Sequence, residues 1–279
     1  MLDDIDNRNE AIDQSLNGTW KAIYEYWEKH TLGMQYISDG SLVVGSQEFF
    51  AHIRPWMNPW KFPWIMERIN REAMLLRGKQ LLEVGCGMGY DSLEFLNRGV
   101  RVTATDLTSN AVILTRRHYE LECVQAEDVL IADALALPFN DCTYDAYWAN
   151  GVLHTTINPE LAISEARRVI KSGGRAVISH FYRKPSWMYL LSRIGRENIE
   201  FKDEDPPINH FYTEAEILNM FKGFEVVEAI QEHYRALPIH RRGLKATLYK
   251  SIFMPVYNLI PELLAKRFAY KFSVTAVKL

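Results

Sequence analysis

The segment Leu81–Asp91, LLEVGCGMGYD, constrains the fold more than any other part of the chain. A short apolar run leads directly into three glycines, Gly85, Gly87 and Gly89, each separated from the next by one residue. An apolar run that stops at glycines is typical of a buried parallel strand entering a tight turn. Glycine also lets the backbone approach a ligand closely. The segment therefore predicts a strand, a glycine loop and a helix, with a ligand held at the loop.

Strand-like and helix-like segments alternate from this point to about residue 181. The expected strands are residues 79–84, 101–105, 129–132, 144–149 and 175–181, and the expected helices are 91–97, 112–119 and 160–170. This alternation indicates a parallel sheet with helices on both faces. One more helix (214–221) and two more strands (224–230 and 272–277) follow. The predicted fold class is α/β, a Rossmann-like seven-stranded sheet.

The alternation breaks on both sides of this core. Residues 1–65 have mainly helical patterns and are expected to form an N-terminal helical cap. Residues 66–183 are expected to form the ligand-binding core. The proline-containing segment 184–212 follows the fifth strand and is expected to be an insertion or lid. Residues 213–279 are expected to complete the core.

Composition narrows the functional classes. The chain has 279 residues and a formal net charge of −3, which argues against a nucleic-acid binder. Its three cysteines form neither an even disulfide set nor a metal-binding pattern, so no metal is expected. An acidic N-terminus argues against a signal peptide, and no apolar run approaches membrane-spanning length, so stable membrane insertion is not expected. A cytoplasmic enzyme is the expectation.

Three acidic residues stand at the ends of three successive expected strands: Glu83, Asp106 and Asp133. Any one of them alone would be read as a helix cap or a turn former. Together they line the carboxyl edge of the predicted sheet, where open α/β folds bind ligands. Glu83 stands two residues before the first glycine and would repel a pyrophosphate group. The loop therefore favours a cationic, amine-bearing ligand over a nicotinamide dinucleotide.

Further motifs follow these carboxylates in a fixed order: Leu137-Pro138-Phe139, Tyr144-Asp145-Ala146, Asn150–His154 and Arg168–Gly174. With the glycine loop, this set resembles the class I methyltransferases that depend on S-adenosyl-L-methionine (SAM), of the type 11 group. The resemblance covers roughly residues 81–181. It implies SAM as the cofactor, S-adenosyl-L-homocysteine as its product, and a small molecule as the methyl acceptor.

The resemblance also implies roles for individual residues. Glu83, Gly85 and Gly87 would hold the methionine part of SAM, with Cys86 as a small packing residue inside the same loop. Asp106 would bind the ribose hydroxyls. The adenine would contact Leu107, Asp133 and Ala134, and Asn150 would lie next to the sulfonium.

A proton acceptor is needed only where the methyl acceptor still holds a proton at neutral pH. His154 directly follows the fourth strand beside the expected sulfonium and is the candidate base. A packing or capping role for His154 remains the alternative. Aromatic-rich segments flank the core, so the acceptor is expected to be apolar or aromatic in part. The candidate acceptor contacts are Tyr26, Trp27, Phe50, His180, His210 and Tyr212.

Two other functions remain open at this point. One is an enzyme of the same fold that binds SAM but catalyses a reaction other than methylation. The other is a SAM-binding regulatory or partner subunit. The sequence does not specify the acceptor, the methylated atom or the oligomeric state.

Overall fold

An eight-stranded sheet forms the centre of the protein. The computed structural model describes residues 18–37, 42–57, 61–195, 206–236 and 244–279. Seven strands lie in the order β3-β2-β1-β4-β5-β8-β7, and β6 pairs beside β5. Their bounds are β1 (Gln80–Val84), β2 (Arg101–Asp106), β3 (Asp128–Ile131), β4 (Tyr144–Asn150), β5 (Ile170–Arg183), β6 (Phe211–Tyr212), β7 (Phe224–Glu232) and β8 (Lys271–Lys278).

The predicted α/β fold is confirmed, with one difference in strand count. All pairings are parallel except those of β8, which runs antiparallel to both β5 and β7. The additional strand, β6, has only two residues, Phe211 and Tyr212. A two-residue strand leaves no periodic pattern in a sequence, so the prediction of seven strands missed it.

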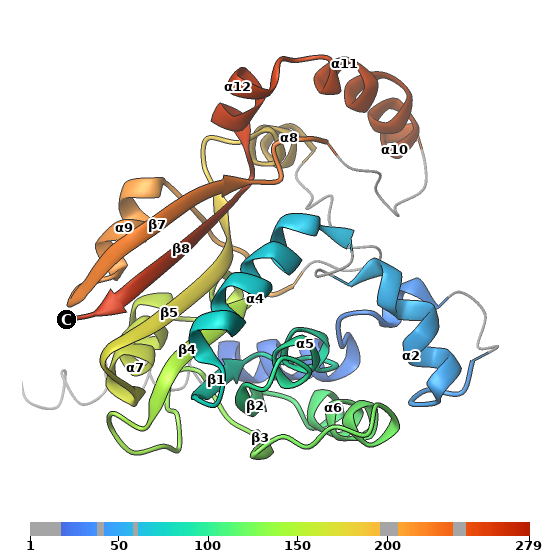
Figure 1. The fold of residues 1–279 in the computed structure, drawn as a ribbon. Helices are drawn as coiled ribbons and strands as arrows, with labels where there is room; N and C mark the ends of the chain where they lie inside the picture. The colour runs from blue at the N-terminus through green and yellow to red at the C-terminus, as the bar shows by residue number, and fades with distance from the viewer. Residues whose placement is uncertain (1–17, 38–41, 58–60, 196–205, 237–243) are drawn as a thin grey trace, which may run out of the picture.

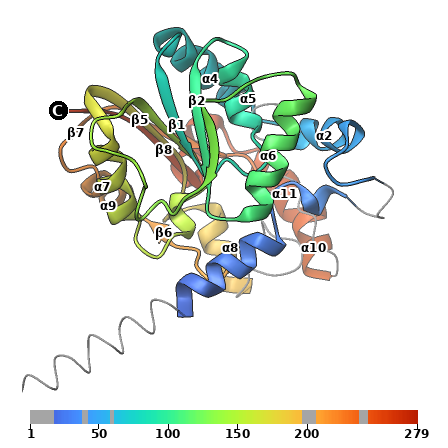
Figure 2. The same ribbon diagram turned by 90° about the horizontal axis from the view of Figure 1, so that it is seen from below.

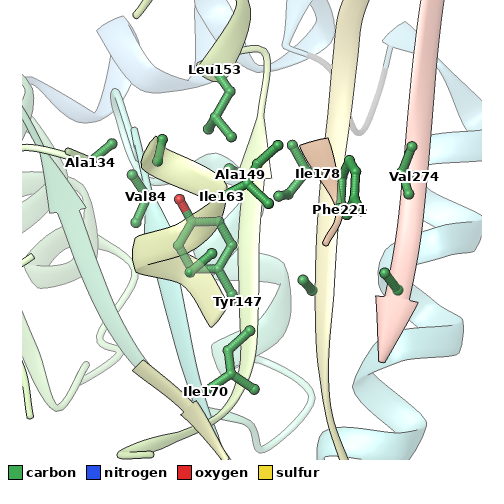
Figure 3. Packing of buried hydrophobic residues seen from close by; sticks show 14 of the residues in the cluster. Val84, Ala134, Tyr147, Ala149, Leu153, Ile163, Ile170, Ile178, Phe221 and Val274 are labelled. Atoms are coloured by element: carbon green, nitrogen blue, oxygen red, sulfur yellow. The ribbon is translucent and has the colours of Figure 1, made fainter. Parts of the chain in front are cut away.

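Helices cover both faces of the sheet (Figure 1). Helices α4 (Pro63–Leu76), α5 (Tyr90–Leu96) and α6 (Ser109–Leu121) pack on one face, and α7 (Pro159–Val169) and α9 (Glu214–Met220) pack on the other. Successive strand residues supply the two faces in turn, because side chains alternate along a strand. In β4, Trp148 packs with the first group, whereas Tyr147 and Ala149 pack with the second. Figure 3 shows Tyr147 lying among Val84, Ala149 and Ile163.

Helices α7 and α9 begin where the sequence specifies a start. The Asn158 side chain accepts a hydrogen bond from the Leu161 amide at 3.0 Å, with Pro159 in the first turn. Thr213 and Glu216 form a reciprocal capping box at the start of α9.

The described residues before α4 contain several short helices, and residues 1–17 of the expected cap lie outside the described residues. Residues 18–29 form a helix, hereafter the N-terminal helix. It is followed by η1 (Met34–Tyr36), α2 (Gln47–Ile53) and η2 (Arg54–Trp56). The expected boundary at residue 65 falls inside α4, which packs on the sheet.

The region after β5 contains α8 (Trp187–Gly195), and part of the expected lid, residues 196–205, lies outside the described residues. A second helical segment interrupts the expected C-terminal core between β7 and β8. It comprises α10 (Leu244–Leu248), η4 (Tyr249–Phe253), α11 (Met254–Asn258), α12 (Glu262–Ala265) and η5 (Lys266–Phe268). Among the described residues, no helix has both the length and the apolarity needed to cross a membrane.

Candidate active site

A cavity of about 320 Å³ opens at the carboxyl ends of the parallel strands. Its walls come from the glycine loop, the ends of β2, β4 and β5, the N-terminal helix and α8. Figure 2 shows the N-terminal helix crossing this side of the molecule. The cavity is therefore bordered by both flanks of the core as well as by the core itself.

The glycine loop has a backbone that only glycine adopts readily. Gly85 has a φ of 74°, and a Cβ atom built on it would lie 2.2 Å from a methyl carbon of Val152. The Gly85 and Cys86 amides donate to the Thr105 carbonyl at 2.8 and 2.9 Å, which fixes the loop against β2. Burial raises the pKa of the Cys86 thiol, in agreement with a packing position for this side chain.

Glu83 lies at the base of the cavity and is 3% exposed. Its Oε2 atom is buried and has no hydrogen-bond partner among the described residues. Burial, and after it the negative charge of Asp91, raises the pKa of Glu83 to about 8. Burying the ionised Glu83 carboxylate is unfavourable unless a positive charge lies beside it, and a cationic ligand in the cavity would provide that charge.

Asp91 and Asn150 form a hydrogen-bonded pair next to Glu83. Asp91 Oδ2 accepts from Asn150 Nδ2 at 2.7 Å and from the Trp148 indole at 2.9 Å. The pair orients the Asn150 amide, whose Oδ1 is buried and has no partner in the described part of the chain. Asp91 also lines the cavity and was not predicted, although its position in the first turn after a glycine loop was a usable signal.

Asp106 is held at the end of β2 by backbone amides. Its two oxygens accept from the Gly87 amide and the Thr108 amide, each at 3.0 Å, and from the Thr108 hydroxyl at 2.8 Å. Burial raises the pKa of Asp106, and these hydrogen bonds oppose that shift. Leu107 lines the same part of the cavity.

Asp133 and Ala134 line the cavity at the end of β3. The Trp20 indole of the N-terminal helix donates to Asp133 Oδ2 at 2.7 Å, and the Leu135 amide donates to Oδ1 at 2.9 Å. The sequence offered no signal for the Trp20 contact, which joins residues 113 positions apart.

His154 follows β4 and lines the cavity. It is 3% exposed, and its ring centroid is 4.3 Å from that of Tyr182. Its Nδ1 is buried without a hydrogen-bond partner among the residues described. Burial, then the charges of Lys271 and His210, hold the pKa of His154 well below its usual range. The ring is therefore neutral near pH 7.

His180 is in the same region and is paired with a histidine that was not predicted. His180 Nε2 lies 3.2 Å from His233 Nε2, and the Tyr270 hydroxyl lies 3.3 Å from His233 Nδ1. Both histidines are buried, line the cavity and have positive φ angles of 70° and 56°. Non-glycine residues in this conformation are uncommon and cluster at functional sites.

A buried ion pair supports the two histidines. Arg68 of α4 is hydrogen-bonded to Glu232, and Glu232 Oε2 lies 3.7 Å from His180 Nε2. Arg68 also donates to the Ser179 hydroxyl at 2.9 Å. His233, Tyr270 and Lys271, which complete this end of the cavity, come from the end of β7 and the region around the start of β8. The first of them, His233, lies 59 residues beyond Gly174, where the last predicted motif ends, so no spacing pattern identified them.

The remaining candidate acceptor contacts divide into two groups. Tyr26 and Trp27 of the N-terminal helix line the cavity. Phe50, His210 and Tyr212 are not among its lining residues. Phe50 is buried and stacks on His118 with ring centroids 4.2 Å apart, so it packs α2 against α6. Tyr212 pairs with Arg183 in the sheet, and the His210 amide donates to the His154 carbonyl at 3.2 Å.

The described residues contain no group of three or more histidine, cysteine and acidic side chains that could hold a metal ion.

Comparison with known proteins finds a family model that matches the core of the chain. Residues 82–178 match the family model described as "Methyltransferase domain".

Two curated relatives match the chain over less than half of its length. The ubiquinone/menaquinone biosynthesis C-methyltransferase UbiE of Roseobacter denitrificans is 33% identical over 129 residues, which are 43% of this chain and 52% of the relative. The malonyl-[acyl-carrier protein] O-methyltransferase of Erwinia billingiae is 30% identical over 113 residues, 40% of this chain and 43% of the relative. The chain thus spans about half the length of the curated relatives it matches.

The fold extends further than the sequence similarity. The solved structure of the [4+2]-cyclase SpnF superposes with a TM-score of 0.55 over 77% of this chain and 79% of SpnF, at 18% identity. At that identity the likeness concerns the fold alone. The similar proteins include a cyclase as well as methyltransferases, so the fold alone does not identify the reaction. The reaction is therefore inferred from the residues of the site.

Proposed function

We propose that the chain is a class I SAM-dependent methyltransferase of the type 11 group, to which its core is similar over residues 82–178, and that it transfers a methyl group from SAM to a small molecule. One observation carries the proposal. Carboxylates from three successive strand ends, Glu83, Asp106 and Asp133, line a single cavity that also contains His154.

The chemistry of the lining residues fits SAM. The cofactor carries a positively charged sulfur and an ammonium group, and four carboxylates line the cavity: Glu83, Asp91, Asp106 and Asp133. Glu83 and Asn150 each have a side-chain oxygen without a partner among the described residues, and these oxygens are able to accept hydrogen bonds from the cofactor or to face its positive charge. Gly85 has no side chain, which lets Val152 pack against the loop.

We assign the cofactor contacts on this basis. Glu83, Gly85 and Gly87 would hold the methionine part, with Cys86 packing behind the loop. Asp106 would bind the ribose hydroxyls, Leu107 would contact the adenine, and Asp133 and Ala134 would bind the adenine edge. Asn150, oriented by Asp91, would lie next to the sulfonium.

SAM supplies the electrophilic methyl group when bound, so the protein has to position the acceptor and exclude water. The buried aromatic side chains Tyr182, Trp187 and Tyr270 form part of the cavity wall and keep this end dry. They favour an acceptor with an apolar or aromatic body.

Two neutral histidines at this end are able to take a proton from such an acceptor. His154 remains the first candidate, because its Nδ1 has no partner in the described structure. His180 is the second candidate, because Glu232 at 3.7 Å would stabilise the charged ring that forms on protonation. Tyr26 and Trp27 are proposed to contact the acceptor from the N-terminal helix.

Mass spectrometry of reactions with SAM and a panel of aromatic hydroxyl compounds tests the proposal. We expect at least one product that is heavier than its substrate by one methyl group, together with S-adenosyl-L-homocysteine. A product without that mass gain would favour a different reaction on the same fold. Tight SAM binding with no turnover of any compound would favour a regulatory or partner subunit.

A further inference from the structure

The outer face of the helical segment between β7 and β8 is apolar and exposed. Eight large hydrophobic side chains in residues 244–268 are each at least 40% exposed: Leu244, Leu248, Ile252, Val256, Leu259, Leu263, Leu264 and Phe268. From Leu244 to Leu259 successive members are three or four residues apart, which places them along one side of the run formed by α10, η4 and α11. The other three members follow in α12 and η5. We call this set the outer stripe. In Figure 1, α10, α11 and α12 arch over α8 at one end of the molecule.

Another face of the same segment packs against α8. Tyr249, Phe253 and Tyr257 surround Trp187 of α8, with ring centroids 6.3, 6.1 and 6.0 Å from the Trp187 ring. Tyr249 and Tyr257 are buried in the cluster that these rings form. The segment is therefore apolar on both sides, a pattern typical of helices that are covered on both sides. The core covers one side, and the outer stripe is on the other.

Charge indicates what covers the outer stripe. Residues 244–268 contain four basic residues and one acidic residue, a net charge of +3 in a chain whose net charge is −3. Lys250 and Arg267 are exposed. Two copies of the chain meeting through this face would bring like charges together. An anionic lipid surface offers both an apolar layer and negative charge.

The composition of the outer stripe also favours lipid over protein. Its members are aliphatic except for Phe268. The centres of protein–protein interfaces are enriched in aromatic residues, methionine and arginine. Helices that lie in a membrane surface carry leucine, phenylalanine and tryptophan on one face and lysine and arginine on the other, and six of the eight members of the outer stripe are leucine or phenylalanine.

We propose that the outer stripe docks the protein on an anionic membrane surface, with α10, α11 and α12 lying in the interface without crossing the bilayer. A statement about the acceptor follows and rests on the proposed methyl transfer. Trp187 lines the cavity and contacts the inner face of the docking segment. The acceptor is then a membrane-dissolved compound that enters the cavity beside Trp187.

Vesicle co-sedimentation of the full chain tests the docking surface. The vesicles are phosphatidylcholine alone, or equal parts of phosphatidylcholine and phosphatidylglycerol, in about 0.1 M salt. The stripe variant is Leu259→Ser/Leu263→Ser. The matched control is Met74→Ser/Ile113→Ser, which removes two comparably exposed apolar side chains from α4 and α6. Thermal unfolding verifies that all three proteins are folded.

We expect the wild type and the control variant to bind the anionic vesicles. The stripe variant should bind them at least about tenfold more weakly. Raising the salt concentration should weaken binding as well. Absence of wild-type binding, or equal binding by the stripe variant, would overturn the proposal. So would a dimer in solution that the stripe variant abolishes while vesicles bind neither protein. The vesicle assay uses neither cofactor nor acceptor. Absence of vesicle binding would therefore not contradict the proposed methyl transfer, and absence of methyl transfer would not contradict vesicle binding.

Discussion

The Nε2 atoms of His180 and His233 lie 3.2 Å apart, and both histidines have left-handed backbone conformations in the interior of the protein. Two nitrogens at that distance share one proton, so one ring donates and the other accepts. The charged and titratable groups around the pair are Lys61, Arg68 of α4, His154 after β4, Glu232 of β7, Tyr270 and Lys271 of β8.

Acid stability tests the state of this pair. Burial lowers the pKa of both rings well below the usual value of 6.5, followed by the charges of neighbouring groups. The unfolded chain therefore takes up protons that the folded chain does not. The contribution of each such histidine to the free energy of unfolding is fully present above pH 6.5. As the pH falls below 6.5, this contribution decreases by about 1.4 kcal/mol per pH unit.

The double variant His180→Asn/His233→Asn is predicted to flatten this loss, measured as the free energy of unfolding between about pH 7.5 and 5.5. Asparagine is chosen because it tolerates positive φ. The exposed residue His52 provides the control variant, His52→Asn, which should retain the wild-type slope. A slope unchanged in the double variant would show that the pair is not buried in its neutral form.

Cofactor affinity should rise with pH because of Glu83. In the free protein the pKa of Glu83 is raised to about 8, chiefly by burial, so this carboxyl carries a proton at neutral pH. A cationic ligand favours the ionised carboxylate, so binding of SAM releases the proton. Affinity for SAM is therefore predicted to increase from about pH 6.5 to 8 and to level off above it. Isothermal titration over this range measures the effect.

The variant Glu83→Gln separates this account from a general pH effect. It should bind SAM at least about tenfold more weakly at pH 8.5 and show little change with pH. It should also be as stable as the wild type or more stable at that pH, because it no longer keeps a charge buried. An unaltered pH dependence would assign the proton to another group.

Gly85→Ala is predicted to abolish cofactor binding for a steric reason that a second substitution relieves. The added Cβ would lie 2.2 Å from Val152 Cγ2. Gly78→Ala is the matched control, because Gly78 has nearly the same φ, 75°, with no atom within 4 Å of the added carbon. The backbone strain is then equal, and the difference between the two variants isolates the contact with Val152.

The double variant Gly85→Ala/Val152→Ala should recover part of the binding that Gly85→Ala loses. Titration calorimetry with S-adenosyl-L-homocysteine is the measurement. Equal losses in Gly85→Ala and Gly78→Ala would place the defect in backbone strain and not in the cavity.

Trp20 is predicted to compete with the cofactor for Asp133. Its indole donates to Asp133 Oδ2, the oxygen proposed to accept from the adenine amino group. Trp20→Phe keeps an aromatic ring beside Tyr24, whose centroid lies 5.6 Å away, and removes only the donor. We expect cofactor affinity to increase by roughly threefold to tenfold, in line with one hydrogen bond of about 1 kcal/mol. A decrease would mean that the indole supports the bound cofactor.

The sequence predicted the parts of the site that are local in the chain. Glu83, Asp106 and Asn150 each lie at or next to the end of a strand, and the glycine loop follows one, so the pattern of the strand fixes their position at the sheet edge. These residues do line one cavity in the structure. Phe50 was misplaced because aromatic residues on α2 look alike in sequence whether they face a cavity or a neighbouring helix.

The other end of the cavity was mostly beyond prediction. His233, Tyr270 and Lys271 reach it because β8 inserts antiparallel between β5 and β7. Their partners are 37 to 53 residues away in the chain, as for the Tyr270–His233 and His233–His180 contacts. Contacts of that range depend on sheet order, which residue patterns do not specify. Pro255 and Pro261 interrupt the helical pattern of the segment between β7 and β8, so the bounds of its helices did not follow from the sequence.

Competition between SAM and NAD for the cavity tests the central claim most directly. Binding of each to the purified full chain is measured by titration calorimetry, alone and in the presence of the other, for the wild type and for Asp106→Asn. We expect one saturable site for SAM that NAD does not displace, and at least about tenfold weaker SAM binding by Asp106→Asn. Binding of NAD in preference to SAM would contradict it.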